Sequence, residues 1–174
     1  HTCLILMAIA AQGLEAQRWP PLEPILARVS TGYAGTPNGW IAGLDLGYRF
    51  NSPLSLVASL QRWDPSFLCT DVCGPDGWTA LLGTRLDFRV SERTYALAHI
   101  EAGLHRFSEE GLARKLVPAT AMRLGFGVHI VPNLLDAEAA MRWQRNAALE
   151  RGSQVLMPTM AFRVWQLAIA IGIG

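Results

Sequence analysis

From Ile25 onward, apolar residues recur at every second position through most of the chain, and this alternation restricts the fold more than any other feature. Within 40–50, for example, Leu44 and Leu46 alternate with Asp45. A period of two is expected of a β-strand with one face in water and the other in an apolar medium. Between the turn signals, the pattern predicts strands over 25–35, 40–50, 54–63, 78–90, 94–107, 116–131, 134–147 and 159–171.

The segment 134–147 (LLDAEAAMRWQRNA) is ambiguous, because it is rich in residues with strong helix propensity. At a period of two, however, its charged and amide side chains fall on one face and its apolar side chains on the other. The first face holds Asp136 and Glu138, and the second holds Met141 and Trp143. Because the neighbouring segments alternate in the same way, we interpret 134–147 as a strand.

In each predicted strand, the charged residues occupy the same set of alternate positions, or parity, as glycine and serine. The other set, which has the opposite parity, is almost wholly apolar. A soluble barrel would instead need a polar exterior rich in lysine and glutamate. In a narrow lumen, glycine leaves room for long arginine side chains, and opposite charges can pair, whereas an unpaired charge would be costly. The residues predicted to form a lumen charge network are Asp45, Arg49, Arg85, Asp87, Arg89, His99, Glu101, Arg123, Asp136, Glu138 and Arg142.

The opposite parity is expected to face lipid. The residues predicted there include Leu44, Leu82, Ile100, Leu124, Phe126, Met141 and Trp143. Outward aromatic residues near strand ends are expected to form interfacial girdles, and they are Trp40, Tyr48, Phe50, Trp78 and Phe88.

The connections between the strands alternate in length. The tight connections NSP, SER and PN alternate with longer and more polar ones, although the first connection, TPNG, is also short. In an up-and-down barrel, this alternation places short turns at one end and longer loops at the other, as in bacterial outer-membrane barrels. We therefore predict an all-β fold over 25–174, an eight-stranded antiparallel up-and-down transmembrane β-barrel. This pattern resembles the small eight-stranded outer-membrane barrels of the OmpA and OmpX type. The resemblance implies an outer-membrane location and carries no functional residue across.

Two positions fit this pattern less well. Arg62 has the lipid-facing parity, so it is expected to lie above the membrane. Near Trp165 the alternation slips, which predicts a β-bulge in the last strand.

The N-terminal residues resemble a secretory signal. A short apolar run, CLILMAIAA, precedes small residues suited to cleavage near Ala16, and it is too short to span a bilayer. We expect 1–16 to be a signal peptide clipped at its start and 17–24 to be a linker, with a buried N-terminal helix as the alternative. In an exported chain, Cys69 and Cys73 are expected to form a disulfide. A metal half-site is the alternative, but no His lies nearby.

The sequence excludes some functions more firmly than it supports one. A net charge of +1 gives no reason to expect a nucleic-acid partner. No phosphate-binding loop, dinucleotide fingerprint or metal-ligand spacing occurs, so no cofactor, metal site or catalytic residue is predicted. The resemblance suggests one enzymatic alternative, because a lipid A deacylase of this fold uses a His-x-Ser pair and an acid on its lipid-facing surface. That pair is absent here, since His99, His105 and His129 precede Glu101, Phe107 and Val131 at that spacing.

We expect instead a structural, anchoring or surface-interaction role, with the outer membrane bilayer around the barrel and an extracellular or envelope protein partner at the loops. A lipid-modifying enzyme, a narrow transport barrel and a soluble lipocalin-like carrier are the alternatives. The last of these would need an apolar lumen and a charged exterior.

Overall fold

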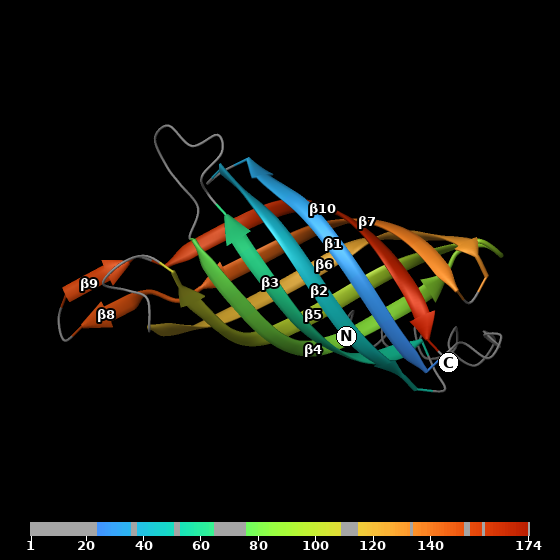
Figure 1. Ribbon diagram of the computed structural model, residues 1–174, viewed down its shortest axis with the longest axis horizontal. Coiled ribbons are helices and arrows are strands. Elements are labelled where there is room, and N and C mark those ends of the chain that lie inside the picture. The colour runs from blue at the N-terminus through green and yellow to red at the C-terminus, as the bar shows by residue number, and fades with distance from the viewer. Residues whose placement is uncertain are drawn as a thin grey trace, which may run out of the picture.

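In the computed structural model, eight antiparallel strands close into a barrel in which β1 pairs with β10 (Figure 1). The described residues are 24–35, 38–50, 53–64, 76–108, 115–132, 134–151, 154–157 and 159–173. The barrel strands are β1 (Ile25–Gly35), β2 (Asn38–Arg49), β3 (Leu54–Asp64), β4 (Gly77–Arg89), β5 (Thr94–Phe107), β6 (Leu116–Val131), β7 (Leu135–Asn146) and β10 (Met160–Ile173). The predicted fold class, an all-β eight-stranded antiparallel barrel, is confirmed.

The ambiguous segment 134–147 forms β7, which pairs with β6 on one side and with β10 on the other. Its inward residues are buried and alternate with partly or fully exposed outward ones. A strand inside a closed barrel has all its backbone groups paired with its neighbours, and this pairing outweighs the helix propensity of its residues.

The two ends of the barrel differ. At the tight-turn end, the connections 50–53, 90–93 and 132–134 join consecutive strands, and β1 begins and β10 ends there (Figure 1). At the long-loop end, the connections are 36–37, 65–76, 108–115 and 147–159. Because the number of barrel strands is even, the first residue of β1 and the last residue of β10 both lie at the tight-turn end.

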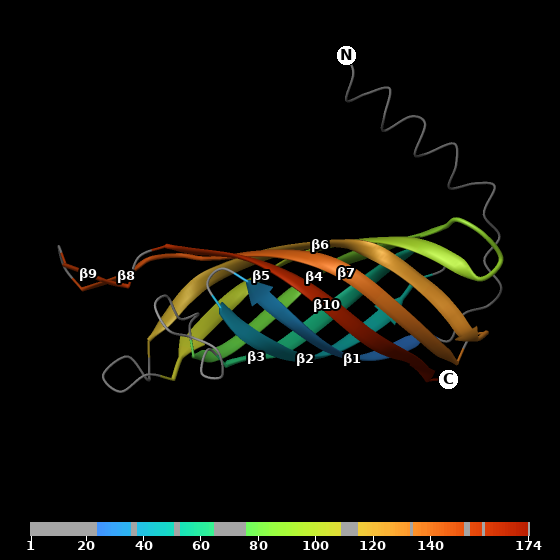
Figure 2. The same ribbon diagram turned by 90° about the horizontal axis from the view of Figure 1, so that it is seen from above.

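The last connection, 147–159, has secondary structure of its own. Within it, β8 (Leu149–Arg151) and β9 (Gln154–Met157) pair as an antiparallel hairpin. Figure 2 shows this hairpin projecting beyond the long-loop end of the barrel. The sequence Gly152-Ser153 between the two short strands is of a kind that favours a tight hairpin turn.

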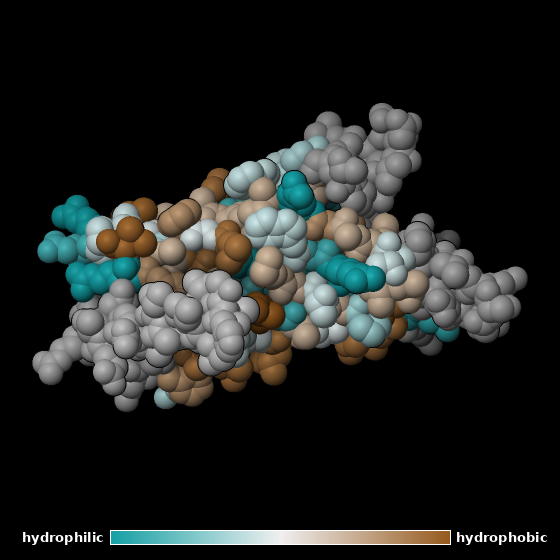
Figure 3. Space-filling view, turned by 180° about the vertical axis from the view of Figure 1, so that it is seen from behind, coloured by the Kyte–Doolittle hydropathy of each residue, from teal (hydrophilic) through white to brown (hydrophobic). Residues whose placement is uncertain are grey.

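The outer wall of the barrel is apolar and exposed. Large apolar side chains point outward from all eight barrel strands, and Ile100, Phe126 and Trp165 are 65%, 66% and 69% exposed. Figure 3 shows brown and pale side chains over most of the described wall seen from behind. A contiguous apolar surface of this extent is unusual for a soluble monomer and is expected of a wall that contacts lipid.

The β-bulge predicted near Trp165 is wrong. β10 pairs with β1 and with β7 in continuous register through this position. The alternation only seems to slip in the sequence because Phe162 and Val164, both apolar, point inward. The register shift among the barrel strands lies instead between His129 and Val131.

None of the described residues forms a helix long and apolar enough to cross a membrane. The signal segment 1–16, the linker up to residue 23 and the Cys69–Cys73 pair lie outside the described residues.

The outward face of β6 offers a direct test of lipid exposure. Phe126→Arg should reduce the stability of the barrel in bilayers by about 2–4 kcal/mol, because it places a charge near the middle of the wall. Leu116→Arg has the same parity on the same strand but lies at its first residue, so it should cost less than about 1 kcal/mol. Phe126→Leu should be tolerated. Urea titration in lipid vesicles measures all three variants, and equal losses for the two arginine variants would contradict this placement.

Candidate functional site

The inward side chains of the strands meet in the lumen, where they form the candidate site. Five carboxylates and five guanidiniums of the described residues interact there. The acids are Asp45, Asp87, Glu101, Asp136 and Glu138, and the bases are Arg28, Arg49, Arg85, Arg123 and Arg142. Because the two signs balance, the lumen carries no large net charge.

Glu101 on β5 is the first centre of this network. Its carboxylate accepts a hydrogen bond from Arg142 Nη1 at 2.7 Å and lies 3.5 Å from Arg123 Nη2. The Ser59 hydroxyl donates to the other carboxylate oxygen. Glu101 is 2% exposed and Arg142 is fully buried, so this pair is shielded from solvent.

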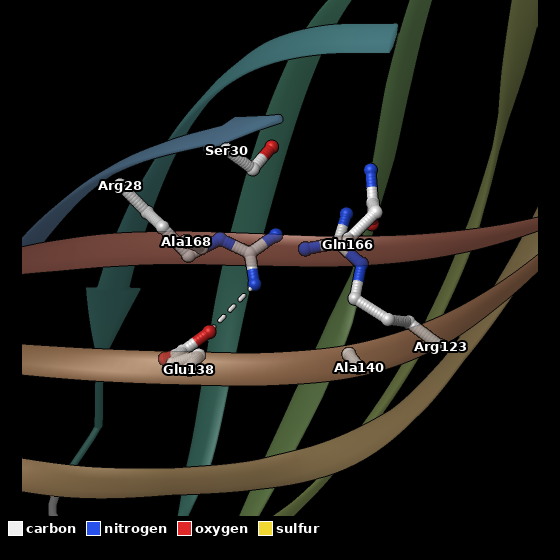
Figure 4. Close-up of a pocket in the computed structure, with 7 residues that line it drawn as sticks. All are labelled: Arg28, Ser30, Arg123, Glu138, Ala140, Gln166 and Ala168. Carbon is white, nitrogen blue, oxygen red and sulfur yellow. Dashed lines mark hydrogen bonds and ion pairs between the residues drawn. The ribbon is translucent and has the colours of Figure 1, made fainter. Parts of the chain in front are cut away.

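Arg28 on β1 joins two further carboxylates across the lumen. Its guanidinium pairs with Asp45 on β2 and, at 2.8 Å, with Glu138 on β7. Figure 4 shows Arg28 reaching from β1 toward Glu138. Arg123 Nη1 donates to Asp45 at 3.0 Å and therefore connects this group to Glu101.

The network continues toward the tight-turn end. Arg85 donates to Glu138 at 2.7 Å and to Asp87 at 2.7 Å. The Tyr95 hydroxyl lies 2.8 Å from Glu138 and 3.2 Å from Asp136, and Asp136 in turn lies 2.6 Å from His129 Nδ1.

The lumen-facing Gly127 is required beside this cluster. A Cβ atom at that position would overlap the Tyr95 ring, so only glycine leaves room for the tyrosine.

At the long-loop end, the lumen is apolar. Trp63 packs on Phe162 with ring centroids 4.8 Å apart, and both belong to a buried cluster with Ile41 and Val164. Polar side chains of β7 follow Arg142 toward the same end. Gln144, the register partner of Phe162, accepts from Arg142 and donates to Asn146 at 3.0 Å.

The lumen is closely filled. A gap beside Arg28, Ser30, Arg123 and Gln166 has essentially no space for a water molecule (Figure 4). Buried ion pairs are tolerated only where several partners compensate for the lost hydration of each charge. Each network carboxylate contacts more than one polar partner, so the arrangement meets this condition and stiffens the barrel.

The residues predicted to form the lumen network do not all have the same surroundings in the structure. Most of them lie in the connected cluster, and Arg49 joins it through Asp87 at 4.0 Å. His99 is buried beside Glu101, with 3.6 Å between Nε2 and the carboxylate. Arg89 lies at the exposed end of β4, where its Nε donates to the Ser91 carbonyl.

Sequence reasoning missed four members of the network. Arg28, Ser59, Tyr95 and His129 all lie at inward positions of their strands. The same alternation could have identified all of them.

The residues predicted to face lipid all point away from the lumen. Leu44, Leu82, Ile100, Leu124 and Phe126 are exposed, and Met141 and Trp143 are partly exposed on the same wall. Of the residues predicted to form girdles, Trp40 and Trp78 are exposed at the long-loop end, whereas Tyr48, Phe50 and Phe88 are exposed at the tight-turn end.

Arg62 lies on the outer wall near the long-loop end of β3. It pairs with Asp76 at 2.5 Å, and its guanidinium lies 5.7 Å from the Trp78 ring centroid.

The described residues contain no group of His, Cys, Asp and Glu suited to hold a metal ion. The carboxylates and guanidiniums of the lumen instead pair with one another, so the geometry supports a packed interior.

Comparison with known proteins identifies the fold. No family model and no curated protein matches the sequence. Among solved structures, Neisserial surface protein A (NspA) matches with a TM-score of 0.58 and 14% identity, over 86% of this chain and 94% of that one. A de novo designed transmembrane β-barrel matches with a TM-score of 0.55 and 13% identity, over 90% and 100% of the two chains. The outer membrane enzyme PagL matches with a TM-score of 0.53 and 13% identity, over 85% and 99%. This chain has the fold of the small eight-stranded transmembrane barrels. The predicted resemblance is thereby confirmed, and at these identities it concerns the fold alone.

Removal of one buried carboxylate tests the network. Glu101→Ala should destabilise the barrel by about 3–5 kcal/mol, because it leaves Arg142 and Arg123 short of a partner in the lumen. Adding Arg142→Met should recover part of this loss by removing a stranded charge. Glu92→Ala, in the exposed 90–93 turn, removes the same charge and should change stability by less than about 0.5 kcal/mol. Urea unfolding in vesicles measures each variant, and no recovery in the double variant would argue against the pairing.

Proposed function

We propose that this protein is an integral outer-membrane barrel that anchors and displays the connections at its long-loop end. The observation that carries this proposal is the inverted distribution of side chains, with charges buried in the lumen and large apolar residues exposed outside. Such a wall suits a bilayer as its solvent. The named neighbours support this location, because one is a surface protein and another an outer membrane enzyme.

The filled lumen favours anchoring over transport. A solute crossing the barrel would have to displace the Trp63–Phe162 plug and separate ion pairs such as Glu101–Arg142. Barrels of eight strands are narrow enough to be filled by their own side chains. The interior therefore serves stability, and interaction with other molecules is left to the outside of the barrel.

The long-loop end is the side we propose to face the exterior. Three of its four connections are longer than the tight turns, and one carries the projecting β8–β9 hairpin. A disulfide between Cys69 and Cys73 would order the 65–76 connection in an oxidising compartment. Export through a cleaved signal at 1–16 belongs to the same proposal, and the partner would be an extracellular or envelope protein.

Surface display of an epitope tests both the location and the orientation. A short epitope inserted between residues 111 and 112 should be detected by antibody on intact cells, because this connection would face outward. The same epitope inserted between Glu92 and Arg93 is the matched control, and it should be detected only after the outer membrane is permeabilised.

Two results would contradict the proposal. The first is labelling of the 92–93 insertion, but not of the 111–112 insertion, on intact cells, which would reverse the orientation. The second is ion conductance by the purified barrel in planar bilayers above the bilayer background, because the filled lumen should pass no ions.

A further inference from the structure

Charged residues on the outer wall gather at one end. The charged side chains that point outward from the described barrel strands all lie within four residues of the long-loop end of their strand. They are Arg62, Asp64, Arg106, Arg145 and Arg163. The remainder of the outward positions, including those at the tight-turn end, are uncharged. The wall is therefore basic only where it would meet one of the two membrane surfaces.

Two of these arginines have no partner within the described part of the protein. Arg62 pairs with Asp76, and Arg106 also has a partner. The side chains of Arg145 and Arg163 are exposed, and neither forms an ion pair or a hydrogen bond with a described residue. A guanidinium at the edge of an apolar wall needs an anionic partner or water for its five donors.

Arg145 borders an open groove of about 450 Å³ on the outer wall, across β5, β6, β7 and β10. Its register partners are Thr120 on β6 and Ala161 on β10, and Thr120 in turn pairs with Ala102 on β5. Because these three side chains are small, the outer surface of the barrel is depressed along this row.

The next row toward the tight-turn end carries larger side chains, with Met122 opposite Trp143 and Trp143 opposite Arg163. The groove therefore has an apolar border on one side and lies close to both unpaired arginines. Glu101 also borders it, but its carboxylate is buried and paired with Arg142.

We propose that this groove binds one anionic phospholipid of the surrounding bilayer, with an acyl chain over Ala102, Thr120 and Ala161 and the phosphate on Arg145. Arg163 is close enough in the register to contribute a second charge to the phosphate. The groove has the size of ordinary ligand sites, which are about 300–1,000 Å³. Arginine forms strong charge-assisted hydrogen bonds with phosphate, and its aliphatic stem packs on apolar surface while its charged end reaches the headgroup region.

This inference rests on the proposed membrane location, since it takes the ligand from the bilayer. Native mass spectrometry of the detergent-solubilised barrel tests it, with dioleoyl phosphatidylglycerol as the probe and dioleoyl phosphatidylcholine as the zwitterionic reference. The first phosphatidylglycerol should bind at least about fivefold more tightly than the first phosphatidylcholine, as expected for an arginine at an anionic surface.

The variants separate the two parts of the site. Arg145→Gln with Arg163→Gln should abolish the preference for phosphatidylglycerol, whereas Arg145→Lys should retain part of it. Arg62→Gln, which removes a charge already paired with Asp76, should keep the full preference. Ala102→Phe should fill the groove and weaken the binding of both lipids. If that variant loses the heat-dependent gel shift of a folded barrel, Ala161→Phe replaces it.

The proposed site would be contradicted if the double glutamine variant kept its full preference for phosphatidylglycerol. It would also be contradicted if Arg62→Gln lost as much of that preference as the double variant. Unchanged binding of both lipids by a folded variant with a filled groove would contradict the site as well. Failure of the membrane proposal is recognised separately, because the protein would then stay folded and monodisperse without detergent.

Discussion

The structure depends on the ion pairs that the lumen encloses. Arginines from five strands share carboxylates from four, and each charge lies where water is largely excluded. A shift of one residue in the register of any of these strands would turn its charges toward the outside and its apolar side chains inward. The network therefore selects one register, and the same alternation that fills the lumen with charge gives the wall its apolar surface.

The distribution of side chains changes along the barrel axis. Through the middle, charges lie inside and apolar residues outside. At the long-loop end the order is reversed, with Trp63 and Phe162 packed inside and Arg145 and Arg163 outside. That reversed order is typical of proteins in water. This distribution suits hydrocarbon in the middle of the barrel and headgroups and water at the long-loop end, where the proposed lipid groove and display connections lie.

The alternation in the sequence was sufficient to predict the strands and the inward position of Glu101, Arg123 and Glu138. It could not predict which charges pair, because partners such as Arg28 and Glu138 lie on strands far apart in the sequence and meet only across the closed lumen. The plug was missed for another reason. A period-two pattern identifies an inward face by its polarity, so the apolar Phe162 made the alternation seem to fail. The outer groove depends on small residues of β5, β6 and β10 that lie in one row with Arg145 of β7, and only the register reveals that alignment.

The central claim is that the charged face is enclosed and the apolar face meets lipid. Photolabelling of the unaltered protein in vesicles that contain a carbene-generating lipid, followed by mass spectrometry of its peptides, tests this claim without any substitution. The account predicts label on Ile100, Leu124 and Phe126 and none on Glu101, Arg123 or Glu138. Label on the charged residues, with none on their apolar neighbours in the same strands, would contradict it.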